Sequence, residues 1–139
     1  MISFEVDSED VGGIVRAVRS VTGADAFRKI SGIRLGKDVL IFEQRFALKT
    51  TVSVKLSCDE SGKLLIRIVS LAENGIGKYG LGLFQGSILN AIENSTGGRL
   101  VRESDSVLSF DPREHLPFPL EFRTVSICDG RLSVQLVLP

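Results

Sequence analysis

The stretch 45-RFALKTTVSVKLSCDESGKLLIRIVSLA-72 decides the fold class of this chain. From Phe46 to Cys58 apolar side chains alternate with polar or small ones, which predicts a long antiparallel strand with one buried face. The segment Glu60-Ser61-Gly62, with Gly62 in the left-handed region, predicts a tight turn into a second strand. The register that follows pairs Leu56 with Ile66 and opposes apolar residues along the hairpin.

The end of the chain repeats this arrangement in VSICDGRLSVQLVLP. Asp129-Gly130 is typical of a two-residue hairpin turn, and it pairs Ile127 with Leu132 and Val125 with Val134. Two further strands are predicted at 29–35 and 39–44, and one or two more after the segment 95–98. The segment 111–120 contains Pro117 and Pro119, and we expect it to be an irregular connection.

Two amphipathic helices complete the prediction. Residues 8–22 place Val11, Ile14, Val15 and Val18 on one face, with Asp7 or Ser8 as the cap. Residues 81–94 do the same with a second apolar face. Its members are Leu81, Phe84, Ile88 and Ile92. We therefore predict one α+β domain over residues 1–139, a curved, mostly antiparallel sheet of six or more strands packed on two helices.

Bulk composition excludes several classes of protein. The chain has 139 residues, and its 17 basic and 17 acidic side chains cancel, which argues against binding nucleic acid through the phosphate backbone. No apolar run approaches the length of a transmembrane helix or a signal peptide, so a cytoplasmic location is expected. Cys58 and Cys128 are then most simply small strand residues, and with the single His115 they make a poor metal-binding set.

The segment 75-GIGKYG-80 matches the G-x-G-x-x-G pattern of dinucleotide-binding loops. Its context disfavours that interpretation, because the preceding strand belongs to an antiparallel hairpin and carries Arg67 in its middle. We instead interpret Gly75, Gly77 and Gly80 as a hinge that brings the second helix onto the sheet. Nucleotide binding at 75–80 remains a third, weaker interpretation.

No catalytic residue, metal site or cofactor is predicted. Ser87 lacks the glycine pattern of a nucleophile elbow, and His115 beside Glu114 fits an exposed or capping histidine. The strand from Lys63 to Ala72 is apolar on both faces, so its second face needs a helix, a partner or an apolar ligand to cover it. The predicted ligand-binding residues are Leu65, Val69, Leu71, Leu81, Phe84, Ile88 and Ile92.

The order of long alternating strands, a glycine-interrupted helix and the final hairpin LEFRTVSICDGRLSVQLVL resembles small bacterial domains of the tubular lipid-binding superfamily. The resemblance covers residues 30–138. It implies a strongly curved antiparallel sheet wrapped on a long helix, with an apolar interior able to take acyl chains. The leading hypothesis is therefore a non-enzymatic module that binds an apolar ligand or lipid between helix 81–94 and the sheet. The alternative is an interaction or assembly subunit that covers its spare apolar face with a partner or a second copy of itself.

Overall fold

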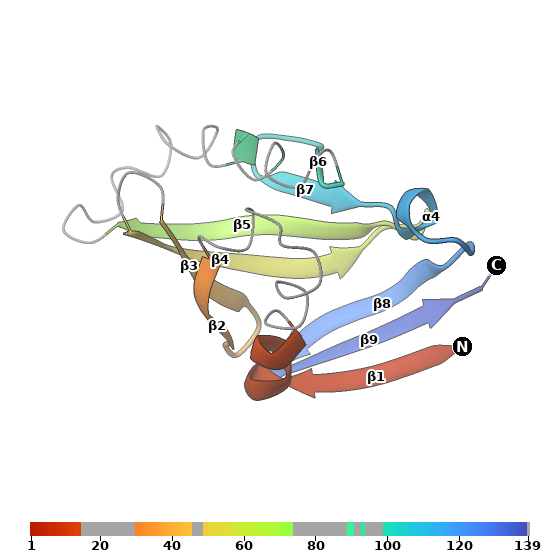
Figure 1. The fold of residues 1–139 in the computed structure, drawn as a ribbon, viewed down its shortest axis with the longest axis horizontal. Helices are drawn as coiled ribbons and strands as arrows, with labels where there is room; N and C mark the ends of the chain where they lie inside the picture. Colours follow the sequence, from red (N-terminus) through yellow and green to blue (C-terminus); the bar gives the residue numbers. More distant parts are fainter. Residues whose placement is uncertain (15–29, 46–48, 74–88, 91–92, 94–98, 139) are drawn as a thin grey trace.

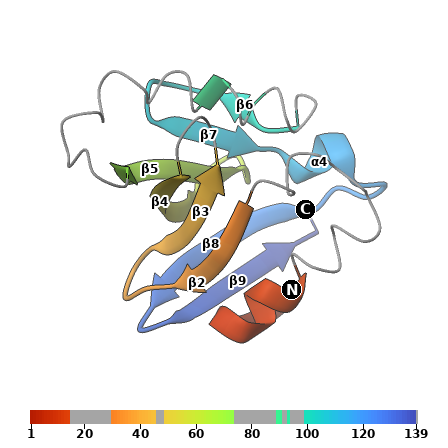
Figure 2. The same cartoon turned by 60° about the vertical axis from the view of Figure 1, so that its left-hand side comes forward.

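The structure, a computed structural model, describes residues 1–14, 30–45, 49–73, 89, 90, 93 and 99–138 (Figure 1). Within these residues the chain is α+β, as predicted, and its strands form two antiparallel sheets (Figures 1 and 2). The strands are β1 (Ile2–Asp7), β2 (Ile30–Leu35), β3 (Leu40–Arg45), β4 (Lys49–Cys58), β5 (Leu64–Glu73), β6 (Val101–Arg102), β7 (Val107–Phe110), β8 (Glu121–Cys128) and β9 (Arg131–Val137).

The larger sheet has six strands in the order β2-β3-β4-β5-β7-β6, which confirms the predicted six-stranded antiparallel sheet. Its central hairpin, β4–β5, has the predicted register, with Leu56 opposite Ile66. Gly62 adopts φ 91° in the turn, in the left-handed region that was predicted for it and that glycine tolerates. Thr50, Val52 and Val54 are buried on one face of β4 while Lys55 is exposed on the other, so the alternation of apolar residues correctly identified the buried face.

A β-bulge interrupts β5, and the alternation of the sequence did not predict it. Val54 pairs with Ile68 but Ser53 pairs with Ser70, so Val69 is the extra residue on β5. Beyond the bulge Leu71 pairs with Val52, a residue of the buried face. The alternation predicted that Leu65, Val69 and Leu71 share one face of the strand. Because of the bulge, the register instead places Leu71 on the face of Val52.

The smaller sheet has the order β1-β9-β8. The β8–β9 hairpin confirms the predicted pairs of Val125 with Val134 and Ile127 with Leu132, and Asp129 and Gly130 both have positive φ in its turn. Strand β1 was not predicted, although Ile2, Phe4 and Val6 alternate with polar residues. It pairs with β9 over its whole length, so the first and last strands of the chain are neighbours.

The two sheets meet along β4 and β8, which are in contact and lie side by side in Figure 1. Backbone hydrogen bonds join them at each end. The Phe122 amide donates to the Gly62 carbonyl at one end, at 3.0 Å. At the other end the Asp129 and Gly130 amides donate to the carbonyls of Lys37 and Gly36, at 2.8 and 3.0 Å. The β8–β9 hairpin is thus fixed to the β2–β3 turn and to the β4–β5 turn of the larger sheet.

Two of the described helical segments follow strands β1 and β7. Residues 8–14 are helical, and Asp7 caps them by accepting a hydrogen bond from the Asp10 amide at 2.9 Å while Asp10 accepts one from the Asp7 amide at 3.3 Å. The remainder of the predicted helix 8–22 lies outside the described residues. The segment 111–120 is irregular except for α4 (Pro112–His115), a single turn that Asp111 caps and Pro112 begins.

Candidate functional site

The predicted ligand site falls only in part within the described structure. Leu65 and Val69 are described, as is the backbone of Leu71 in β5. Several predicted positions lie outside the described residues: Leu81, Phe84, Ile88, Ile92 and the hinge glycines Gly75, Gly77 and Gly80. Their predicted roles, and nucleotide binding at 75–80, stay predictions. The C-terminal part of the predicted second helix is described at Leu89, Asn90 and Glu93, all of them helical.

Leu89 shows which face of the larger sheet this helical segment covers. Its side chain is fully buried in a cluster whose other members come from the sheet: Val52, Val54, Ile68 and Leu108. A second set of apolar side chains surrounds this cluster and is only half-buried. They are Leu40, Phe42, Leu56, Ile66 and Leu100. The apolar face of the sheet is therefore wider than the part that is completely removed from solvent.

The pairing of β5 places Leu65 on the other face. Ile66 and Ile68 pair with Leu56 and Val54 and belong to the face under Leu89, whereas Leu65 pairs with Ser57. Val69 sits at the bulge and is 42% exposed. Leu65 and Val69 are thus not brought together with Leu89, and their part in ligand binding stays a prediction. On β5, Ile68 belongs to the cluster around Leu89, and Ile66 packs against that cluster.

Arg102 of β6 fastens the helical segment to the edge of this sheet. Its backbone amide donates to Glu93 Oε2 at 2.7 Å, and its Nη1 donates to Asn90 Oδ1 at 2.9 Å. Its second Nη reaches Asp105 at 3.2 Å. These contacts attach the helical segment to β6, the edge strand of the larger sheet.

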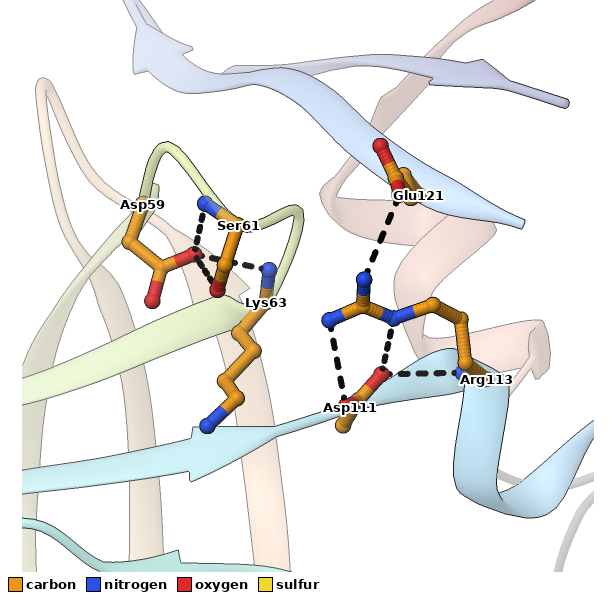
Figure 3. A network of polar contacts seen from close by, with 6 residues as sticks. All are labelled: Asp59, Ser61, Lys63, Asp111, Arg113 and Glu121. Atoms are coloured by element: carbon orange, nitrogen blue, oxygen red, sulfur yellow. Dashed lines mark hydrogen bonds and ion pairs between the residues drawn. The ribbon is translucent and has the colours of Figure 1, made fainter. Parts of the chain in front are cut away.

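A polar network stands at the junction of the two sheets (Figure 3). On one side, Asp59 closes the β4–β5 turn, because one carboxylate oxygen accepts hydrogen bonds from the Ser61 amide, the Ser61 hydroxyl and the Lys63 amide, at 3.0, 2.8 and 2.9 Å. Burial alone would raise the pKa of Asp59, but these donors outweigh it and lower the pKa below its ordinary value.

On the other side of the network, Arg113 of α4 lies between two carboxylates (Figure 3). Its Nε donates to Asp111 Oδ1 at 2.9 Å and one Nη to Asp111 Oδ2 at 3.2 Å, while the other Nη reaches Glu121 of β8 at 3.2 Å. Hydrogen bonding from Arg113 lowers the pKa of Asp111, and the same bond raises the pKa of Arg113. Arg113 binds Asp111, which follows β7, through two hydrogen bonds and Glu121 of β8 through a third, and so joins the start of β8 to the end of β7.

The backbone of Gly62 completes the junction. A Cβ added at this position would lie 2.6 Å from Cβ and 2.8 Å from Cγ of Glu121. Only a residue without a side chain allows β8 to approach the turn this closely. The sequence pointed to Gly62 for its turn conformation and gave no sign of this second requirement.

The polar contacts of this network suit a structural role. A general acid at neutral pH needs a raised carboxyl pKa, yet the resolved shifts of Asp59 and Asp111 are both downward. Each of these carboxylates is also occupied by fixed donors of the same network. We therefore assign the network to holding the two sheets together.

The histidine and the cysteines form no joint site in the described part of the chain. His115 is exposed and stacks on Phe110, with ring centroids 5.3 Å apart. The Cys58 thiol donates to the Arg123 carbonyl at 3.2 Å, and Cys128 is exposed at the end of β8. Among the described residues no three histidine, cysteine, aspartate or glutamate side chains are grouped so that they could bind a metal ion.

The smaller sheet has one apolar and one polar face. Ile127 and Val134 are buried on the apolar face, and Phe4 of β1 pairs with Val134 on the same side. On this face the exposed fraction rises toward β1, to 42% at Phe4 and 50% at Ile2. This surface was not predicted, because strand β1 was not recognised in the sequence.

Comparisons with known protein families, with curated proteins and with solved structures each find no match. Within the described residues, no helix is both long enough and apolar enough to cross a membrane.

Proposed function

We propose that this protein is a non-enzymatic binding module that takes an apolar ligand, such as a lipid acyl chain, on the face of the larger sheet covered by the helical segment at Leu89. One observation carries the proposal. Around the buried cluster, a broad margin of large apolar side chains, Phe42 and Ile66 among them, remains half-buried. An apolar ligand that covered this margin would gain about 25 cal/mol for each Å² removed from water.

The arrangement of the helical segment also supports this proposal. The helical segment is attached to the edge strand β6 of the larger sheet through Arg102. In the proposed site the sheet would form one wall, and the helical segment would cover it.

Adjacent positions of β5 provide a matched test. Ile66→Ala shortens a side chain on the proposed binding face, and Leu65→Ala shortens its neighbour on the opposite face, starting from a similar half-buried state. Binding of a fluorescent fatty acid should weaken about tenfold in Ile66→Ala, since roughly 1–2 kcal/mol of apolar contact is lost. It should be unchanged in Leu65→Ala.

Two results would contradict the proposal. If wild-type protein takes up no fatty acid, the proposed function is wrong. If Leu65→Ala weakens binding and Ile66→Ala does not, the ligand lies on the opposite face. Urea unfolding of each variant serves as the folding control, because both substitutions also remove buried apolar surface.

A second candidate function is an interaction or assembly subunit. The observation that favours it is separate from the larger sheet, because it concerns the apolar side chains exposed on β1 at the edge of the smaller sheet. Exposed apolar groups beside a strand edge are typical of surfaces that associate.

A further inference from the structure

We propose that β1 is a homodimer interface, at which the strand pairs antiparallel with β1 of a second copy of this chain about a two-fold axis at Phe4. The inference rests on the second of the proposed functions and names its partner and its surface. The two three-stranded sheets would then join into one continuous sheet, with their apolar faces on the same side.

The backbone amides and carbonyls of β1 point alternately toward β9 and away from it. The Asp7 amide donates to the Asp10 side chain, so it points away from β9. In an antiparallel strand the amide and carbonyl of one residue point the same way and successive residues alternate. The outward groups of β1 therefore belong to Ser3 and Glu5 as well as Asp7, while those of Ile2, Phe4 and Val6 point toward β9.

The β8–β9 turn leads independently to the same outward backbone groups on β1. Asp129-Gly130 is a two-residue turn, so Cys128 and Arg131 exchange hydrogen bonds and the backbone groups of Arg131 point toward β8. The groups of Val134, three residues further along β9, then point toward β1, where the register pairs them with Phe4. Both routes leave Ser3 and Glu5 with outward groups, and both residues are exposed.

Strand β1 lacks most of the devices that keep strand edges apart. Edge strands are commonly protected by lysine, proline, a bulge or a covering element. The sequence of β1, ISFEVD, contains neither lysine nor proline, and its pairing with β9 has no register shift. Among the described residues no strand pairs with its outer edge. Its central charge, Glu5, already faces Arg131 at 3.6 Å and accepts from the Ser133 hydroxyl at 3.3 Å.

The outer edge of β1 is complementary to itself, so its partner is a second copy of this chain. A two-fold axis at Phe4 sets Phe4 opposite its own copy, Ile2 opposite Val6, and Ser3 opposite Glu5. The outward groups of Ser3 and Glu5 then meet as hydrogen-bonded pairs, and the serine hydroxyl faces a carboxylate. Shifting the axis to Glu5 would place two carboxylates directly opposite each other, which is destabilising.

The interface is small. One strand pair with its flanking side chains buries less than the roughly 1,200 Å² of total surface that separates weak complexes from standard ones. We therefore expect a reversible dimer, with a dissociation constant in about the micromolar range or weaker. The two-fold contact closes on itself, so it stops at the dimer.

Disulfide trapping reads the register directly. In a background with Cys58→Ser and Cys128→Ser, Phe4→Cys places two thiols at a non-hydrogen-bonded pair, where Cα atoms are about 4.5 Å apart and a disulfide can form. Ile2→Cys is the matched control on the same face of the strand. Its two copies would lie roughly 13 Å apart along the strand pair, beyond the reach of a disulfide.

Ser3→Pro tests the hydrogen bonds. It removes an outward amide without removing a bond to β9, whereas Ser3→Ala keeps the amide. Sedimentation of the full chain, between about 1 µM and 1 mM to bracket the expected affinity, should show a dimer in wild type and Ser3→Ala and a monomer in Ser3→Pro. Circular dichroism and urea unfolding confirm that Ser3→Pro is folded.

The outcomes separate the two levels of the proposal. Trapping of Phe4→Cys but not of Ile2→Cys, together with loss of the dimer in Ser3→Pro, supports the β1 interface. A dimer that persists in folded Ser3→Pro overturns the β1 interface and leaves the assembly function standing. Wild-type protein that stays monomeric over the whole range, with no trapping of Phe4→Cys, overturns both the β1 dimer and self-assembly.

Discussion

Replacing Gly62 with alanine tests how the two sheets are joined. The substitution has two costs. Alanine must adopt φ near 91°, which costs about 1–2 kcal/mol for a residue with a side chain. Its Cβ would also lie 2.6 Å from Cβ of Glu121, and making room in a packed contact costs about 1–3 kcal/mol.

Gly130→Ala is the matched control, because it carries the first cost and not the second. Gly130 has φ 77° in the other hairpin turn, and the nearest atom to an added Cβ is the Leu35 carbonyl oxygen at 3.9 Å. We therefore expect Gly62→Ala to lower the free energy of unfolding by about 2–5 kcal/mol and Gly130→Ala by about 1–2 kcal/mol.

Urea unfolding followed by circular dichroism measures both variants, and thermal unfolding gives a second reading. The difference of about 1–3 kcal/mol corresponds to roughly 3–10 °C in Tm for a chain of this length. Equal losses in the two variants would refute the reasoning, since they would mean that β8 does not press against the turn at Gly62. A more stable Gly62→Ala would refute it as well.

Three further predictions concern other parts of the structure. Asp111→Asn keeps an oxygen that can cap α4 but loses the ion pair with Arg113, so it should lower the free energy of unfolding at pH 7 by about 1–2 kcal/mol. The folded pKa of Asp111 lies below its ordinary value of 3.8, so its stabilisation is complete above about pH 4 and is lost as the pH falls through the lowered pKa. Urea titrations from pH 7 to pH 2 should show a weaker acid dependence in Asp111→Asn than in wild type, and identical slopes would contradict the assignment. Leu89→Ala should lower the free energy of unfolding by about 2–5 kcal/mol, because Leu89 is fully buried. Leu116→Ala, at a residue that is 39% exposed, should lower it by less than about 1 kcal/mol. Similar losses in urea unfolding would mean that Leu89 does not pack on the sheet. An aromatic disulfide reagent should modify the exposed Cys128 at least about tenfold faster than Cys58, which is half-buried and donates to the Arg123 carbonyl. The rates are measured separately in Cys58→Ser and Cys128→Ser, and equal rates would contradict the burial of Cys58.

The sequence predicted the parts of the fold that are encoded locally. The β4–β5 and β8–β9 registers follow from short turns whose glycine and aspartate residues set the loop length, and cross-strand apolar pairs reinforce them. The Asp7 cap follows from the same kind of local chemistry. Each of these depends on residues close together in the chain.

The remaining features depend on contacts between distant residues. Strand β1 is stabilised by β9, more than a hundred residues away, and six residues alone carry too weak an alternation to reveal it. The bulge at Val69 was hidden because Ile68 and Val69 are both apolar and fit either phase of the alternation. The covering of Ile66 and Ile68 likewise depends on where Leu89 comes to lie.

Native mass spectrometry of the freshly purified chain tests the proposed function most directly. The account predicts a species heavier than the bare chain, whose extra mass is released by organic solvent and identified as an apolar molecule. It also predicts that chain stripped in this way regains mass when a fatty acid is added. Bare chain alone, before and after addition of the fatty acid, would contradict the account.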